Sequence, residues 1–115
     1  MSQILFYNPG QLATITLDIT VNGVRSDGYD YPALLPYVNR ILFPNLMEAA
    51  NYPQNMTRLD IGLYAYSFTL PQGAVAVGSY LADVVVYDPI TGNPVTILYQ
   101  IVCTAPFGLY SASTG

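Results

Sequence analysis

The sequence predicts an all-β domain, an antiparallel β-sandwich. Several segments alternate apolar and polar residues, glycine and proline are frequent between them (9 of each), and 115 residues suit one domain rather than two. The candidate strands number about six to eight and recur at a spacing of roughly 10 residues, which is typical of a two-sheet sandwich. We therefore expect a sandwich over residues 11–104, an N-terminal arm over residues 1–10 and a C-terminal arm over residues 105–115.

The clearest strand candidate covers residues 12–22. Its odd-numbered positions from 13 to 21 are apolar and its even-numbered positions from 14 to 22 are polar. A period of two predicts a strand with one buried and one exposed face. The pair Asn22-Gly23 is favoured in two-residue hairpin turns, because both positions need a positive φ. We expect a tight hairpin there, with a short returning strand.

The middle of the chain has weaker signals. Residues 29–55 contain four prolines, which remove backbone donors and argue against long central strands. They are Pro32, Pro36, Pro44 and Pro53. Residues 37–43 are expected to form a strand of medium length. Residues 45–50 (Asn-Leu-Met-Glu-Ala-Ala) are expected to form a short helix with Asn45 as its N-cap.

The C-terminal half is predicted to be β again, with strands over residues 59–70, 78–87 and 95–104. A segment rich in turn-forming residues, 88–93, connects the last two strands. The single cysteine, Cys103, can form no internal disulfide, and its strand context predicts a small buried apolar residue rather than a reactive thiol.

The last two predicted strands form a hairpin whose outer surface is half apolar. If the even-numbered residues from 80 to 86 face the core, then Leu81, Asp83, Val85 and Tyr87 face outward, with Leu98 among the outward positions of the partner strand. A free face of an antiparallel sheet is usually more polar. We therefore expect a cover over this surface, provided by an extra strand, a loop from the middle of the chain or another chain.

The charge composition excludes several functional classes. Only 9% of residues are charged, the positive side is three arginines with no lysine or histidine, and the net charge is −4. Such a chain cannot form the basic surface that nucleic-acid binding requires. The stretch between Asp60 and Asp83 lacks charge, but its proline, its glycines and its hydroxyls argue against a membrane span.

Recognisable chemistry is also missing. Without histidine or lysine, Ser–His and Ser–Lys catalysis cannot be built within one chain, and the sequence lacks the ligands of a zinc site. We predict no enzyme activity, no cofactor and no metal. The segment Asp27-Gly28-Tyr29-Asp30 has the oxygen groups of a Ca²⁺ loop, but turn chemistry is the preferred interpretation.

Two Gly-x-Tyr segments carry a family resemblance. Gly62-Leu63-Tyr64 lies within residues 60–71 and Gly78-Ser79-Tyr80 begins residues 78–84. Together they resemble the core pattern of immunoglobulin-like and macroglobulin-like domains, over about residues 11–104. The resemblance implies an immunoglobulin-like sandwich of the kind found in tailed-bacteriophage virion proteins, with a tyrosine corner formed by one of these tyrosines. The intersheet disulfide and core tryptophan of antibody domains are absent.

These observations predict a structural virion protein, specifically a capsid decoration (cement) protein that stabilises the assembled shell. The expected partner is the major capsid protein or another virion protein. We also expect homo-oligomers on the particle and localisation in the virion, after assembly in the host cytoplasm. The alternatives are a tail, neck or fibre adaptor and a carbohydrate-binding module that uses exposed tyrosines. The predicted partner-binding residues are Ile4, Leu5, Phe6, Tyr7, Leu81, Val85, Tyr87, Leu98, Phe107, Leu109 and Tyr110.

Overall fold

The computed structural model describes residues 2–73 and 76–104, and this part of the chain is all-β, as predicted. Three of its strand segments have only two residues each. The strands are β1 (Ser2–Tyr7), β2 (Leu12–Asp18), β3 (Thr20–Val21), β4 (Val24–Arg25), β5 (Tyr37–Leu42), β6 (Gln54–Asn55), β7 (Thr57–Asp60), β8 (Leu63–Thr69), β9 (Gly78–Tyr87) and β10 (Pro94–Cys103).

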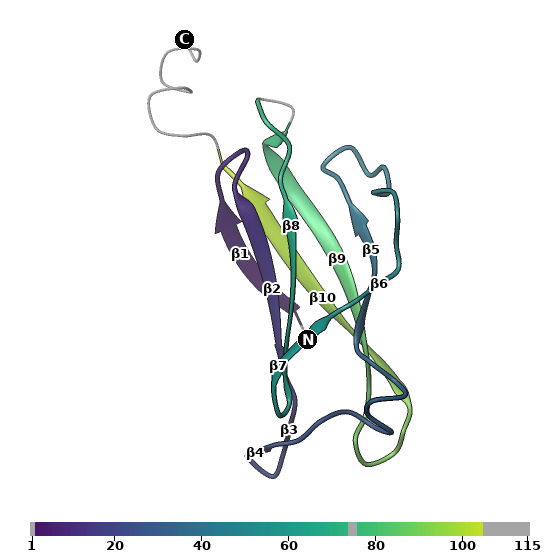
Figure 1. Cartoon of the computed structure of the whole chain (residues 1–115). Helices are drawn as coiled ribbons and strands as arrows, with labels where there is room; N and C mark the ends of the chain where they lie inside the picture. Colours follow the sequence, from purple (N-terminus) through teal and green to yellow (C-terminus); the bar gives the residue numbers. More distant parts are fainter. Residues whose placement is uncertain (1, 74–75, 105–115) are drawn as a thin grey trace.

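Two sheets pack against each other around one core (Figure 1). The larger sheet has the order β1-β10-β9-β5-β6, and the smaller has the order β2-β8-β7. All neighbours in both sheets are antiparallel except β1 and β10, which run parallel. The hairpin β3–β4 extends from the end of β2.

Alternate residues of the facing strands fill the space between the sheets, which confirms the predicted period of two. Cys103 is buried there, also as predicted, and burial raises the pKa of its thiol. The buried residues include Ala13, Ile15 and Leu17 on β2, Val38 and Ile41 on β5, Tyr64 on β8, Tyr80, Ala82 and Val84 on β9, and Tyr99, Ile101 and Cys103 on β10.

The hairpin at Asn22-Gly23 is confirmed. Both residues have positive φ (52° and 81°), and the flanking residues pair as Val21 with Val24 and Thr20 with Arg25. A turn of this kind matches the twist of the two strands that it connects.

Two predicted strands are interrupted, and one contact explains both interruptions. The predicted strands 12–22 and 59–70 break at Ile19 and at Gly62, where the Ile19 amide donates to the Gly62 carbonyl at 2.8 Å. Gly62 has φ +69°, and a Cβ there would lie 2.7 Å from the Ile19 carbonyl oxygen. Only glycine fits such a close approach of two backbones, so the chain turns at this residue.

The predicted helix over residues 45–50 is wrong. The Asn45 side chain accepts from the amide of Met47, two residues on, and closes a turn instead of capping a helix. The chain then returns beside β5, where Glu48 forms an antiparallel bridge with Leu42 and the Ala49 amide donates to Ile41. Pairing with β5 therefore prevails over local helix propensity.

The N-terminal segment differs from the predicted free arm. Residues 2–7 form β1, the edge strand of the five-stranded sheet, in register with residues 98–103 of β10. Pairing with β10 satisfies backbone groups that a free arm would expose, and Tyr7 packs against the core. The predicted C-terminal arm, residues 105–115, lies outside the described residues.

The three largest fully buried side chains are tyrosines, and each hydroxyl donates a hydrogen bond. Tyr80, near the start of β9, donates to the carbonyl of Ala76, which lies four residues upstream and before β9 (2.8 Å). The resemblance implies a hydrogen bond of this kind for a tyrosine corner. Tyr64 donates to the Asp27 carboxylate (2.7 Å) and Tyr99 to the Thr16 carbonyl (2.6 Å).

The bond from Tyr99 crosses from one sheet to the other and ends on the outer edge of β2. Burial raises the pKa of Tyr99 to about 12, so the hydroxyl remains a donor over the ordinary pH range. On the same edge, the Tyr7 hydroxyl accepts from the Thr14 amide (3.0 Å) and donates to the Thr14 carbonyl (3.3 Å). Two hydroxyls of the larger sheet thus satisfy an edge strand of the smaller one.

Replacing Tyr99 with phenylalanine tests this link. The Tyr99→Phe variant keeps the ring and leaves the Thr16 carbonyl without its donor, so the free energy of unfolding should fall by about 1–3 kcal/mol. Urea unfolding measures the change. The matched control is Tyr29→Phe, because Tyr29 is 47% exposed and should change stability by less than about 0.5 kcal/mol. Equal midpoints for the two variants would show that the Tyr99 hydroxyl contributes nothing.

Candidate interaction surface

The outer face of the five-stranded sheet is the strongest candidate for a functional surface. The predicted orientation of β9 is confirmed, because Tyr80, Ala82 and Val84 are buried in the core and the alternate residues face away from it. Five predicted partner-binding residues lie on this outer face, namely Phe6, Leu81, Val85, Tyr87 and Leu98.

The register aligns outward residues of β1, β10, β9 and β5 into rows across the face. Each row runs roughly perpendicular to the strands and combines side chains from different parts of the sequence. The rows are Phe6, Val102 and Ser79; Gln100, Leu81 and Leu42; Leu98, Asp83 and Arg40; Thr96, Val85 and Tyr37; and Pro94 and Tyr87.

Leu42 also lies on this face, although it was not among the predicted residues, and a β-bulge in β5 turns it outward. The register with β9 shifts between Val38 and Arg40, so Val38 and Ile41 are both buried in the core. Simple alternation from Val38 would place Leu42 inside. The sequence has no clear signal for this bulge.

Two charged side chains at the centre of the face, Arg40 and Asp83, form an ion pair. The Arg40 Nε donates to the Asp83 carboxylate at 2.7 Å, and this contact raises the pKa of Arg40. Asp83 is largely shielded, with 16% of its side chain exposed. Because the two charges compensate each other, the face has no net charge from this pair.

The described residues leave much of this face open. Phe6 is 69% exposed and Leu98 is 45% exposed, so the expected cover by a middle loop does not reach these two side chains. Val85 is only 8% exposed, and beside it burial and the neighbouring Tyr87 raise the pKa of Tyr37. The apolar surface is therefore shielded around Val85 and open toward Phe6.

The remaining predicted residues fall into three groups. Tyr7 packs against the core, and its hydroxyl bonds the Thr14 backbone instead of facing a partner. Ile4 and Leu5 belong to β1, where their backbones pair with Gln100 and Ile101 of β10. Phe107, Leu109 and Tyr110 lie outside the described residues, so no observation bears on them.

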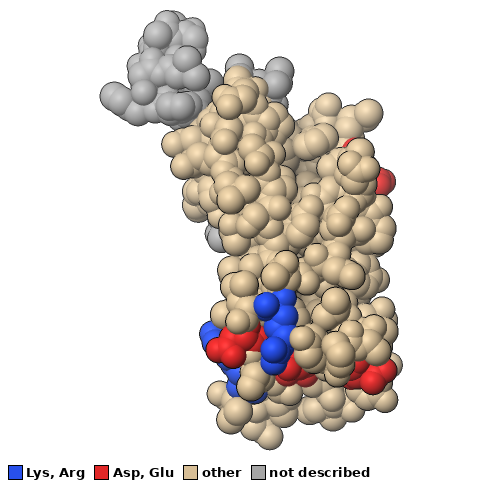
Figure 2. All heavy atoms as spheres, viewed as in Figure 1, with Lys and Arg blue, Asp and Glu red and all other residues tan. Residues whose placement is uncertain are grey.

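Charge is concentrated at one end of the molecule. Figure 2 shows the charged side chains of the visible face gathered over its lower third, where the β3–β4 hairpin lies in Figure 1, apart from acidic atoms at the right-hand edge. Two of the ion pairs in the described residues belong to this end, Arg25 with Asp18 (3.1 Å) and Arg58 with Asp27 (3.0 Å). The opposite end has an almost uncharged surface in this view.

The loop considered as a cation site has another role. Asp27 accepts from Arg58 Nε (3.1 Å) and Nη2 (3.0 Å), from the Gly62 amide (2.9 Å) and from the Tyr64 hydroxyl (2.7 Å). The Arg58 guanidinium also lies over the Tyr31 ring, 4.8 Å from its centroid. The carboxylate is thus committed to protein donors, and within the described residues no group of three potential ligands converges for a metal.

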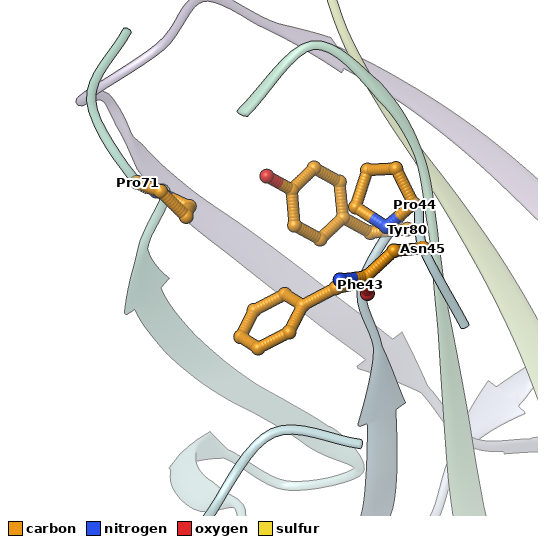
Figure 3. A pocket seen from close by; sticks show the side chains of 5 residues that line it. All are labelled: Phe43, Pro44, Asn45, Pro71 and Tyr80. Carbon is orange, nitrogen blue, oxygen red and sulfur yellow. The ribbon is translucent and has the colours of Figure 1, made fainter. Parts of the chain in front are cut away.

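A pocket of about 550 Å³ opens between the two sheets at the end opposite the β3–β4 hairpin. We call this end the uncharged end, because little charge is visible there in Figure 2. Figure 3 shows Pro71, which follows β8, across the opening from Phe43, Pro44 and Tyr80. The rings of Phe43 and Tyr80 meet edge to face, with centroids 5.9 Å apart. Asn45 completes the lining, so the pocket is mostly apolar and aromatic.

A scan of the chain against protein-family models finds no match, and a search of curated proteins also finds none. In the described part of the chain, no helix has the length and apolar character needed to span a membrane.

The Asp27 cluster predicts a specific dependence of stability on pH. Hydrogen bonding to Arg58 lowers the pKa of Asp27 from 3.8 to about 2. Because the folded pKa is the lower one, the stabilisation is fully present above pH 3.8 and is lost as the pH falls through about 2. Urea unfolding of the wild type at several pH values from about 6 down to about 2 should show this loss.

The Asp27→Asn variant should be less stable at neutral pH by about 1.5–3 kcal/mol, the usual worth of hydrogen bonds to a charged group. It should also lose less stability on acidification than the wild type. Asp30→Asn, in the same loop and exposed, is the matched control and should keep the wild-type pH profile. Identical profiles for Asp27→Asn and the wild type would contradict the assignment.

Proposed function

We propose that this protein is a structural binding module that docks onto a larger protein assembly through the outer face of its five-stranded sheet. The observation that carries the proposal is the open apolar part of that face, from Phe6 to Leu98, around a mutually compensated ion pair. The cores of protein interfaces are depleted in charge and rich in apolar side chains, as this face is.

The assembly that we propose is the shell of a tailed bacteriophage, with the protein as a capsid decoration protein. Support comes from the Gly-x-Tyr segments and their resemblance to immunoglobulin-like virion modules. Both tyrosines are buried, and the hydrogen bond from the Tyr80 hydroxyl to the Ala76 carbonyl supports the tyrosine corner that the resemblance implies. The strand orders add support: with β2 taken as strand B, β2-β8-β7 can be named BED and β10-β9-β5-β6 can be named GFCC′, with β1 as an additional strand beside β10.

Decoration would act by mass action. A protein that binds the assembled shell but not its separated subunits stabilises the shell in proportion to its occupancy. A rigid sandwich suits this role, because little conformational entropy is lost when a preformed face docks.

The surface gives little support to a sugar-binding platform. Of the described tyrosines only Tyr29 is exposed, and the others are partly or fully buried. We therefore keep the tail, neck or fibre adaptor as the alternative, since such an adaptor could use the same sheet face.

Copy number distinguishes the two virion roles. Quantitative mass spectrometry of purified particles of the phage that encodes the chain should find it in proportion to the major capsid protein. A copy number that is a small fraction of the capsid protein would favour the adaptor. Absence from purified particles would overturn the virion assignment.

A substitution on the proposed face tests the surface itself. Leu98→Gln removes an exposed apolar side chain from the face and should weaken binding to undecorated shells about tenfold, equivalent to about 1.4 kcal/mol. The matched control is Leu59→Gln, because Leu59 is 60% exposed on β7 of the other sheet and should leave binding unchanged. Sedimentation of shells with labelled protein measures both affinities. Loss of binding in the Leu59 variant alone would place the docking surface on the other sheet.

A further inference from the structure

The pocket at the uncharged end has a fixed apolar frame. The turn that forms one wall is closed by the Leu46 amide donating to Phe43 (2.8 Å) and the Phe43 amide donating to Met47 (2.9 Å). Behind it, Gly78 lies so close to Pro44 that a Cβ at Gly78 would be 2.7 Å from the Pro44 ring. This wall of the pocket is thus fixed by backbone hydrogen bonds and by close packing against β9.

The last described strand ends close to this pocket. Cys103, at the end of β10, pairs directly with Gly78 of β9, which in turn contacts the pocket wall at Pro44. Paired residues on adjacent strands lie only about 5 Å apart. The chain that continues beyond Thr104 therefore starts one strand away from the pocket.

The continuing segment matches the pocket in chemistry and length. Residues 105–115 contain no charged side chain and include Phe107, Leu109 and Tyr110. Three extended residues span about 10 Å, so Phe107 can reach the opening from Thr104. A pocket of about 550 Å³ accommodates an aromatic side chain and part of its backbone.

We propose that the pocket is the docking site of the chain's own C-terminal segment, residues 105–115, with Phe107 as the side chain that enters between Phe43, Pro44 and Pro71. A short tether gives the segment an effective concentration in the millimolar range, which a separate copy at micromolar concentration does not match. The contact is therefore intramolecular. It requires no partner, so its test is independent of the proposed virion role.

Photo-crosslinking from position 107 of the full chain tests the proposal. The photoreactive residue p-benzoylphenylalanine replaces Phe107, and the protein is irradiated at low micromolar concentration. Trypsin cleaves after Arg40 and Arg58 and so separates peptide 41–58, which carries the Phe43–Asn45 wall, from peptide 59–115. The expected product joins these two peptides within a monomer, in a yield that does not change with protein concentration.

The control places the same photoreactive residue at Val24, which is 68% exposed on the hairpin at the charged end, and should give no link to peptide 41–58. A link from position 107 that occurs only in dimers would overturn the intramolecular assignment. No link from position 107 to peptide 41–58, or an equal link from position 24, would overturn docking in the pocket.

Discussion

Hydrogen bonds between tyrosine hydroxyls of the larger sheet and the unpaired backbone edge of β2 connect the two sheets. Each hydroxyl gains a partner in the interior, and the edge gains partners that no neighbouring strand supplies. β2 pairs only with β8 in the described sheets, so one side of its backbone lacks a ladder. Tyr7 and Tyr99, from the other sheet, bring their hydroxyls to Thr14 and Thr16 on that side. A buried hydroxyl and an unpaired carbonyl are each costly alone, whereas together they join two sheets that no disulfide connects.

This arrangement explains how a tyrosine-rich core coexists with a surface that is poor in charge. The polar requirements of the interior are met by tyrosine hydroxyls and by Asp27, which also binds Arg58. Two ion pairs of the described chain lie at the hairpin end, and the pair on the outer sheet face, Arg40 with Asp83, is mutually compensated. The end with the pocket shows little charge on the face seen in Figure 2. Both surfaces that we propose for docking follow from this separation.

Local patterns predicted the local features of the fold, and non-local contacts account for what was missed. Alternation located β9 and β10 and their outward residues, and Asn22-Gly23 located the hairpin. The parallel pairing of β1 joins residues almost a whole chain apart, and no short-range pattern encodes it. Likewise, the partners of Asp27 are more than 30 residues away, and the bulge that turns Leu42 outward depends on the register with β9.

Amide hydrogen exchange at Thr14 tests the role of the tyrosine hydroxyls most directly, because this amide lies on the free side of β2 and donates to Tyr7. In the wild type it should be protected like an amide of the sheet ladder, and in Tyr7→Phe its exchange should accelerate about tenfold or more. The Ile15 amide, on a residue paired with Tyr66 of β8, should change much less and serves as the internal reference. Equal Thr14 exchange in both proteins, or a wild-type Thr14 amide that exchanges as fast as an exposed loop, would contradict the account.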